Sequence, residues 1–228
     1  MSKYVISDIH GCYEEFIKMM DLINFKEDDE LFILGDVIDR GHNPLEIIDY
    51  IMSHSNISLI KGNHEEIFID YYNGDEPYAW FFNGGKTTYD QLEERGTEYA
   101  ERLYKYISSL PLIKVIDKYI LVHSTLDFID NYNDLSLEVF LNKQEENICL
   151  WGRENIGEEK QYKDYTVICG HTPVQVINET KRDEEVKILY RKGTIYIDCG
   201  CFIGKHEGGK LACLRLDDKQ EFYVKSID

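Results

Sequence analysis

The feature that most constrains the fold is a short apolar run with charged residues directly behind it, the stretch LFILGDVIDRG from Leu31 to Gly41. Four apolar residues closed by a glycine indicate a buried strand, because the run is too short for a helix. Asp36, Asp39 and Arg40 need partners there, since burying an unpaired charge is costly. A metal ion at Asp36 and a phosphate at Arg40 would supply them. A polar loop that caps a helix starting near Pro44 explains this stretch equally well.

Two neighbouring stretches show the same order of apolar run and polar loop. The run from Tyr4 to Ser7 ends in DIHG (8–11), and the run from Ile57 to Ile60 ends in KGNHE (61–65). Apolar residues at helical spacing separate the three runs, which predicts a βαβαβ unit. Crossovers of this kind are nearly always right-handed and leave the strands parallel.

Parallel strands bring their carboxyl ends to one edge of the sheet, where the ligands of open α/β sheets bind. Residues that follow the three predicted strands should therefore lie close together, although they are far apart in the sequence. The residues expected at this edge are Asp8, His10, Asp36, Asp39, Asn63 and His64.

The rest of the chain is first helical and then rich in strands. Helices are predicted at 65–72, from Pro77 and at 98–109, and strands at 112–116, 119–122, 166–169, 188–190, 194–198, 210–216 and 221–224. Residues 125–149 are acidic and irregular, and we expect a surface excursion with one helix near 135–141. These patterns predict a mainly antiparallel second sheet packed against the first. The expected fold is one α/β domain over residues 1–228, a βαβαβ core within a mixed two-sheet sandwich.

Composition limits the partners and the location. A net charge of −18 disfavours long nucleic acids, which need a basic surface. The sequence has no apolar run long enough to span a bilayer and no leader pattern, so we expect a cytoplasmic protein without membrane contact. The six cysteines include no CxxC pair, and we expect them to be reduced and mostly buried. Cys12 lies at a predicted helix N-terminus, where a thiol pKa can be lowered, but packing is the simpler role for it.

Four of the seven histidines follow predicted strands directly or one residue later: His10, His64, His123 and His171. A single histidine in such a loop is usually a satisfied loop residue. Four of them, together with Asp8, Asp36 and Asn63 in equivalent places, indicate a metal centre. Imidazole, carboxylate and amide ligands without thiolate suit manganese, ferrous iron or zinc in a catalytic site better than a structural zinc. So many ligands suggest two ions rather than one.

The loop motifs together resemble a known family. The segments SDIHG (7–11), GDVIDRG (35–41), GNHE (62–65), VHS (122–124) and GHTP (170–173) are similar to those of the phosphoprotein phosphatase branch of the calcineurin-like metallophosphoesterases. Further matches at WFFNGG (80–85), LPLI (110–113), WGRE (151–154) and YID (196–198) resemble the small serine/threonine protein phosphatases of bacteria and bacteriophage lambda. Ser7 departs from the usual glycine of the first motif. The resemblance implies the four-layer metallophosphoesterase fold.

The resemblance also implies a role for each motif residue. Asp8 and His10 would hold the first metal, Asp36 would bridge both, and Asn63, His123 and His171 would hold the second. Two divalent ions are expected, with Mn²⁺ favoured and Fe²⁺ or Zn²⁺ as alternatives.

Four further residues would act on the substrate. His64 would protonate the leaving oxygen and be oriented by Asp39, and Arg40 and Arg153 would bind the phosphate. A guanidinium can hold two phosphate oxygens at once, which suits the two arginines to this role. A surface ion pair with Glu154 is the alternative explanation for Arg153.

The function implied is a metal-dependent phosphatase in which metal-bound hydroxide attacks phosphorus directly. The expected substrates are phosphoserine and phosphothreonine in proteins, or small phosphate esters. The first alternative is a symmetrical diadenosine tetraphosphate hydrolase, since such enzymes share every motif named. A nucleotide or RNA-end phosphatase and an inactive binding module are the others. The sequence leaves the physiological substrate, the native metal and the oligomeric state open.

Overall fold

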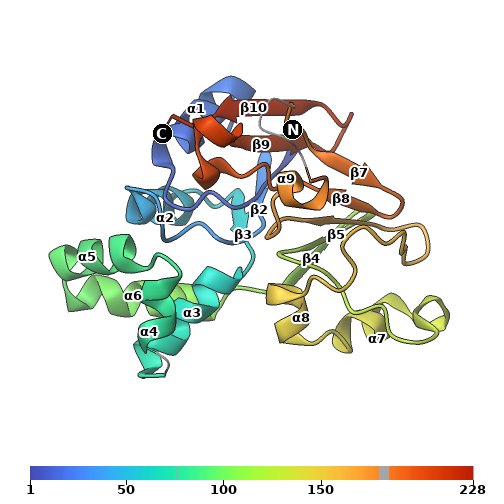
Figure 1. Ribbon diagram of the computed structural model, residues 1–228, viewed down its shortest axis with the longest axis horizontal. Helices are drawn as coiled ribbons and strands as arrows, with labels where there is room; N and C mark the ends of the chain where they lie inside the picture. The colour runs from blue at the N-terminus through green and yellow to red at the C-terminus, as the bar shows by residue number, and fades with distance from the viewer. Residues whose placement is uncertain (76, 180–184, 228) are drawn as a thin grey trace.

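The computed structural model describes residues 1–75, 77–179 and 185–227, which form two five-stranded sheets with helices packed on them (Figure 1). The first sheet has the order β10-β9-β1-β2-β3, and the second has the order β4-β5-β6-β8-β7. The strands of the first sheet are β1 Lys3–Ile6, β2 Glu30–Ile33, β3 Ile57–Leu59, β9 Lys210–Arg215 and β10 Glu221–Lys225. Those of the second are β4 Ile113–Ile116, β5 Tyr119–Val122, β6 Thr166–Cys169, β7 Leu189–Arg191 and β8 Thr194–Tyr196.

The predicted βαβαβ unit is confirmed. Strands β1, β2 and β3 are parallel neighbours, joined through helices α1 (Tyr13–Ile23) and α2 (Pro44–Ser53). Side chains alternate between the faces of a strand, and here they enter two different cores. Tyr4 and Ile6 pack with the buried face of α1, whereas Val5 packs with residues of the second sheet. This alternation explains why the three strands read as continuous apolar runs.

The second sheet differs from the prediction. It contains two antiparallel pairs, β4 with β5 and β7 with β8, and two parallel pairs, β5 with β6 and β6 with β8. The last two strands do not belong to it, because β9 pairs antiparallel with β1 and β10 pairs with β9. The expectation of a mainly antiparallel second sheet that includes the C-terminal strands was therefore wrong. Both sheets are mixed.

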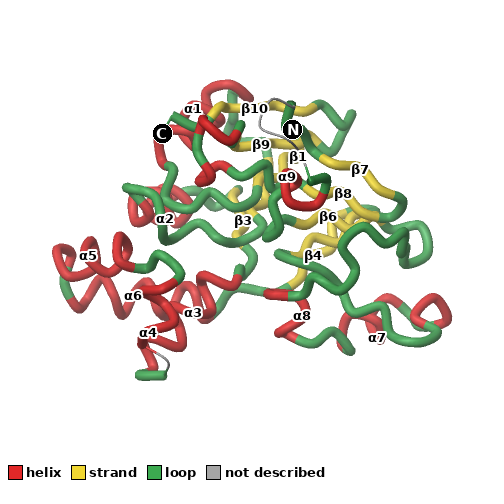
Figure 2. The backbone as a smooth tube through the Cα atoms, viewed as in Figure 1, coloured by secondary structure: helices red, strands yellow, loops and turns green. Residues whose placement is uncertain are grey.

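Apart from α1 and α2, the helices gather in two groups outside the sheets (Figures 1 and 2). The first group is α3 Asn63–Asn73, α4 Pro77–Phe82, α5 Lys86–Arg95 and α6 Thr97–Ser108. The second group is α7 Leu137–Asn142 and α8 Glu146–Trp151, and the short α9 Val174–Ile177 lies beside β8. No helix that the structure describes is both long enough and apolar enough to cross a bilayer.

Two expectations about helices need correction. Helices α5 and α8 were not predicted, because apolar positions are sparse in α5 and because α8, with six residues, is too short to show helical periodicity. Residues 125–149 are not a mere surface excursion, since Leu126, Phe140 and Cys149 are fully buried in the second core. Phe140 stacks on Tyr162 with ring centroids 4.3 Å apart, and this contact ties the segment to the domain.

The parallel strands of both sheets point toward one region. Strands β1, β2 and β3 of the first sheet, and β5, β6 and β8 of the second, are parallel to their neighbours within each group. The loops that follow these six strands carry Asp8, Asp36, Asn63, His123, His171 and Asp198. The two sheets therefore build one site together.

Candidate metal centre

The loops at the centre have unusual backbone conformations. Twelve non-glycine residues among those described have positive φ, and six of these twelve are predicted site residues: Asp8, His10, Asp36, Asp39, Arg40 and His171, with φ between 47° and 70°. Each such residue costs of order 1–3 kcal/mol and persists only where the surrounding structure imposes it. Their concentration at one edge of the sheets indicates that the contacts of these side chains offset the energetic cost of the backbone conformations.

Asp36 lies in the middle of the centre. Its Oδ2 is 3.5 Å from Nε2 of His10 and 4.0 Å from Nε2 of His64, and its Oδ1 is 3.5 Å from Nε2 of His123. Burial acts to raise the pKa of Asp36, but the imidazoles of His123, His64 and His10 hold it below its usual value. Asp36 is therefore an ionised carboxylate, with Oδ2 facing His10 and His64 and Oδ1 facing His123.

Hydrogen bonds orient the imidazoles. His10 places Nδ1 3.2 Å from the carbonyl of Ile38, and His123 places Nδ1 2.6 Å from the carbonyl of Leu34. A carbonyl accepts only an N–H, so Nδ1 carries the proton in both rings and Nε2 is left as a donor for a metal. Burial lowers the pKa of both residues, which keeps both rings neutral as ligands must be.

Asn63 and His171 complete the second half. The Asn63 Oδ1 atom is 2.9 Å from Nε2 of His123 and 2.9 Å from Nδ1 of His171. Burial lowers the pKa of His171 to about 3, so this ring is also neutral. Its Nε2 is buried and has no hydrogen-bond partner among the residues that the structure describes, which is rare for a polar atom.

Asp8 lies on the opposite side of Asp36 from Asn63. Its two carboxylate oxygens accept hydrogen bonds from the backbone N–H of His171 at 3.2 and 3.0 Å, and it also accepts one from the Ser7 hydroxyl. Serine in place of the usual glycine thus adds a donor to the centre. Burial, followed by the charges of Asp198 and Asp36, raises the pKa of Asp8 well above its usual value. Three carboxylates so close together favour a positive charge between them.

His64 is placed differently from the other imidazoles. Its Nδ1 is 2.7 Å from Asp39 Oδ2, and both residues are fully buried. Asp39 is itself held by Trp80 Nε1 at 3.0 Å and by the Thr88 hydroxyl at 2.6 Å. Burial lowers the pKa of His64, but the carboxylates Asp36 and Asp39 outweigh it, and the net shift is upward. His64 is thus the one predicted imidazole of the four whose pKa is raised.

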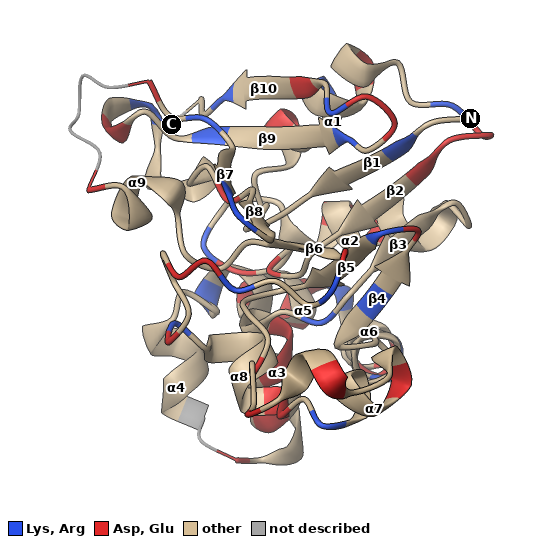
Figure 3. Cartoon of the chain, turned by 90° about the vertical axis from the view of Figure 1, so that its right-hand side faces the viewer, with Lys and Arg blue, Asp and Glu red and all other residues tan. Residues whose placement is uncertain are grey.

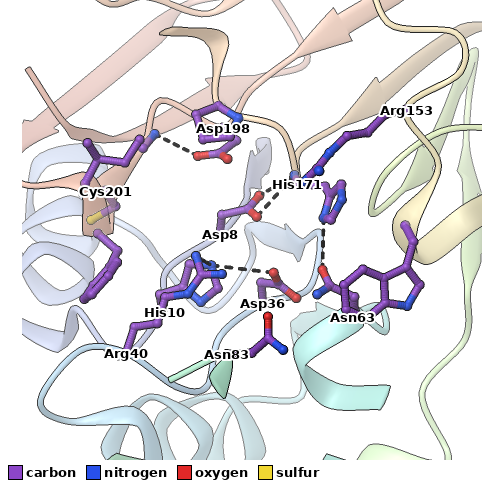
Figure 4. Close-up of a pocket in the computed structure, with 15 residues that line it drawn as sticks. Asp8, His10, Asp36, Arg40, Asn63, Asn83, Arg153, His171, Asp198 and Cys201 are labelled. Carbon is purple, nitrogen blue, oxygen red and sulfur yellow. Dashed lines mark hydrogen bonds and ion pairs between the residues drawn. The ribbon is translucent and has the colours of Figure 1, made fainter. Parts of the chain in front are cut away.

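The two arginines reach the cavity from opposite sides (Figure 4). Arg40 has its guanidinium nitrogens 2.9 Å from Nε2 of His10 and 2.9 Å from Nε2 of His64. Arg153 is exposed, donates from Nε to the Thr172 hydroxyl at 3.3 Å and lines the cavity. It therefore faces the centre. The cavity measures about 190 Å³, and all of the predicted metal-binding residues except His123 line it.

Several residues at the centre were missed by sequence reasoning. Buried Glu65 accepts hydrogen bonds from the backbone N–H groups of Asp36, Val37 and Gly62 at 2.8 to 3.0 Å, and so ties the second and third loops together. Asp198 is buried and lines the cavity, and its burial raises its pKa to about 7. The motif matches GNHE and YID contain both residues, but nothing in the spacing gives them a role.

Close backbone contact is also required here. A Cβ atom on Gly35, which has φ of +84°, would lie 2.5 Å from the Cα atom of Gly62. Only glycine permits the two loops to approach this closely. The close approach brings Oδ1 of Asp36 to 3.0 Å from the backbone nitrogen of His64.

The residues present fit a pair of divalent ions. Two overlapping groups have ligand atoms within 4.8 Å of one another, His10 with Asp36 and His64, and Asp36 with His123 and His171. Asp36 is common to both, and His171 places Nδ1 2.9 Å from the Asn63 Oδ1 atom, so this ring nitrogen lies on the ligand side of the centre. All the donors are nitrogen or oxygen, which suits a catalytic rather than a structural ion.

Comparison with known proteins identifies the family. The family model of calcineurin-like phosphoesterases matches residues 1–200, and the chain belongs to this family. The expected resemblance is confirmed, and the protein is a metal-dependent phosphoesterase with a buried His/Asp centre.

Relatives of two kinds are similar to the chain. Serine/threonine-protein phosphatase 2 of Salmonella typhimurium is 30% identical over 158 residues, which are 67% of this chain and 68% of the phosphatase. The symmetrical bis(5'-nucleosyl)-tetraphosphatase of Chromobacterium violaceum is 25% identical in an alignment of 279 positions, gaps included, that covers 97% of this chain and 94% of that protein. In several other symmetrical tetraphosphatases the matching stretch is 67 residues, about a quarter of their own length.

A solved structure supports the fold. The crystal structure of a protein described as a candidate diadenosine tetraphosphatase superposes with a TM-score of 0.68 at 18% identity, covering 98% of this chain and 92% of that one. The predicted metallophosphoesterase fold is thereby confirmed.

Proposed function

We propose that this protein is a dinuclear-metal phosphatase that hydrolyses phosphomonoesters, with phosphoserine and phosphothreonine in proteins as its substrates. The observation that carries the proposal is the division among the imidazoles. Backbone carbonyls hold Nδ1 of His10 and of His123 and leave Nε2 free to bind a metal, whereas the carboxylate of Asp39 holds Nδ1 of His64, an arrangement that suits a proton donor.

The proposed ligands fall into two sets that share Asp36. Asp8, His10 and Asp36 hold one ion, and Asp36, Asn63, His123 and His171 hold the other. Asp198 lies next to Asp8 and adds negative charge to the first set. When bound, the two ions supply positive charge to the phosphate oxygens and lower the pKa of a bound water.

His64 is the proposed general acid. Asp39 accepts a hydrogen bond from Nδ1, so Nε2 points toward Asp36 and accepts a hydrogen bond from Arg40, which lines the cavity. Once the Arg40 guanidinium turns from Nε2 to a bound phosphate, a proton on Nε2 can pass to the leaving oxygen. General acid catalysis of this kind contributes roughly 10²–10⁴-fold to the rate. Trp80 and Thr88 fix Asp39 and thus act as positioning residues.

Arg40 and Arg153 are the proposed phosphate-binding residues. They approach one cavity from opposite sides, and a guanidinium can donate two parallel hydrogen bonds to a phosphate (Figure 4). Loss of one such donor typically costs about 3–4 kcal/mol of transition-state stabilisation. Arg153 is exposed and lines the cavity, so an incoming phosphate can reach it from solvent.

Charge favours a compact phosphate substrate over a polyanion. The chain carries 43 acidic and 25 basic side chains. Asp and Glu occur along α3 and α7, while Lys and Arg are scattered over strands such as β1, β4 and β9 (Figure 3). A nucleic-acid binder gains much of its affinity by neutralising many phosphates. One phosphate needs only the local positive charge of the centre.

A symmetrical dinucleoside tetraphosphate is the second candidate substrate. The relative from Chromobacterium violaceum, which is such a tetraphosphatase, matches nearly the whole of both chains, whereas the protein phosphatase matches two thirds. A dinucleoside tetraphosphate is also compact and could reach the centre from one side.

Competition between the two substrates tests the proposal. With Mn²⁺ and salt held constant, kcat/KM is measured for a phosphothreonine peptide and for diadenosine tetraphosphate. We expect the peptide to be preferred. His64→Asn protein prepared in parallel controls for contaminating phosphatases. A preference for the dinucleotide of a hundredfold or more, about 2.7 kcal/mol of transition-state binding, would make the second candidate the function.

A further inference from the structure

A second group of possible ligands lies beside the candidate centre. The thiols of Cys12 and Cys201 and a carboxylate oxygen of Glu15 lie within 4.8 Å of one another. We propose that these three residues form a separate site for a thiophilic divalent cation, of which Zn²⁺ and Cd²⁺ are the representatives. The inference goes beyond the proposed phosphatase activity and does not depend on it.

The fold brings the three residues together from two elements. Cys12 is the N-cap of α1 and Glu15 lies three positions later, so both side chains share one face of the first helical turn. Cys201 begins the short 3₁₀ helix Cys201–Ile203, which follows β8 and packs beside β9. The Cys12 thiol donates a hydrogen bond to the backbone carbonyl of His10, with sulfur and oxygen 3.7 Å apart, and its sulfur lies within 4.8 Å of the Cys201 sulfur. Figure 4 shows Cys201 at the edge of the catalytic cavity, on the side away from Arg153.

Glu15 is oriented for this role. Its carboxylate is buried, and Oε1 accepts a hydrogen bond from the backbone N–H of Ile227 at 2.8 Å. The bond fixes the orientation of the carboxylate. Outer hydrogen bonds of this kind commonly orient the ligands of metal sites.

Access is provided by a neighbouring cavity of about 600 Å³, which shares Arg40 and residues 201–203 with the catalytic one. Cys12, Glu15 and Cys201 line it, so an ion and a water ligand can reach the group from solvent. Cys12 is only partly buried, whereas Glu15 and Cys201 are buried. A tetrahedral ion would take three protein ligands and leave its fourth position toward this cavity.

The ligand chemistry separates this group from the candidate catalytic centre. Two thiolates select zinc or cadmium over manganese, while the nitrogen and oxygen donors around Asp36 do not. The charge also balances. A divalent cation displaces one proton from each thiol to solvent, so the net charge of the buried group is the same before and after binding. Burial therefore opposes occupancy less than it would oppose adding an unpaired charge.

The other cysteines do not share this arrangement. Cys149, Cys169, Cys199 and Cys213 are buried, and none belongs to a group of three close ligands within the described part of the chain. They supply matched controls.

Occupancy would affect the neighbouring catalytic cavity. Phe202, next to Cys201, has its ring 5.8 Å from the Arg40 guanidinium and 6.3 Å from the His10 ring. An ion that joins Cys201 to α1 would hold this aromatic side chain against both residues.

The test is a titration of the Mn²⁺-loaded protein with Cd²⁺ under a thiol-free reductant, monitored by the ultraviolet charge-transfer absorption of sulfur-bound cadmium. Nitrogen and oxygen ligands do not give this band, so the signal reports the thiol site alone. We expect saturation at one equivalent. Cys12→Ser and Glu15→Gln should each weaken Cd²⁺ binding by more than about 100-fold, because each removes a ligand and even the loss of a hydrogen-bond partner of a ligand typically costs about 10–100-fold.

Two controls keep the result interpretable. Cys149→Ala should leave the band unchanged, and near-ultraviolet circular dichroism should show that every variant is folded. Absence of the band in the folded native protein would overturn the proposal. Its persistence at full strength in Cys12→Ser would do so as well, because the thiolates would then lie elsewhere.

Discussion

Replacing Asp36 with asparagine should remove bound metal and phosphatase activity together. The side chain is common to both ligand groups and lies within 3.5 Å of His10 and of His123. An amide has nearly the same shape but no charge to attract two cations. We expect kcat for p-nitrophenyl phosphate to fall by at least about 10³-fold, the upper end for losing one preorganised electrostatic partner. Elemental analysis after dialysis against Mn²⁺ should show fewer than two equivalents.

Asp21→Asn provides the matched control for this change. Asp21 lies on the exposed face of α1, remote from the loops of the centre, and its replacement should leave metal content and kcat at native values. Two full metal equivalents in folded Asp36→Asn protein would show that Asp36 does not bridge the ions.

His64→Asn should instead lower catalysis while leaving the metal in place. Its Nδ1 is engaged by Asp39, and its raised pKa suits a proton donor rather than a ligand. We expect kcat to fall roughly 10²–10⁴-fold for a phosphothreonine peptide. The loss should be much smaller for p-nitrophenyl phosphate, because nitrophenolate leaves without protonation. Comparing the two substrates separates general acid catalysis from a general loss of structure.

The pH dependence gives an independent readout of the same residue. An acid must be protonated to act, and Asp36 and Asp39 raise the pKa of His64 despite its burial. Activity should therefore persist to higher pH than an ordinary imidazole allows and fall as pH rises through that pKa. Asp39→Asn should move this basic limb to lower pH, and His64→Asn should remove it.

Loss of a metal equivalent in His64→Asn protein would contradict the assignment. That outcome has a structural basis, because Nε2 of His64 lies 4.0 Å from Asp36 and His64 belongs to one of the two ligand groups. His64 would then be a ligand, and another group would have to donate the proton.

The centre could be predicted because its residues directly follow strands. Asp8, Asp36 and Asn63 lie just beyond three parallel strands, and parallel order places them at one edge whatever the rest of the chain does. The same reasoning applies to His123 and His171, which follow the parallel strands β5 and β6. The position of each of these residues just after a predicted strand was therefore enough to predict that they converge.

Residues that support the centre could not be found in this way. Trp80 and Thr88 lie 41 and 49 positions from Asp39, and only tertiary packing brings them to its carboxylate. Trp80 belongs to the motif match WFFNGG, but nothing in that match predicts that the indole N–H binds Asp39. Glu65 shows the same limit, since its three backbone partners become close only when two loops meet.

The pairing partners of the last two strands could not be predicted from the sequence either. The pattern of β9 and β10 predicts two strands but not the sheet that they join, because either edge would bury their apolar face. In the structure β9 pairs with β1, and this places the C-terminal hairpin on the first sheet. Non-local pairing of this kind leaves no signal within a single strand.

The central claim is that Asp36 joins two metal ions that the reaction requires. Its most direct test is the turnover of p-nitrophenyl phosphate by chelator-stripped protein as Mn²⁺ is added back, with bound metal counted at each step by elemental analysis. The account predicts no turnover without metal and full activity only as the second equivalent binds. Full turnover by protein shown to be free of metal would contradict it.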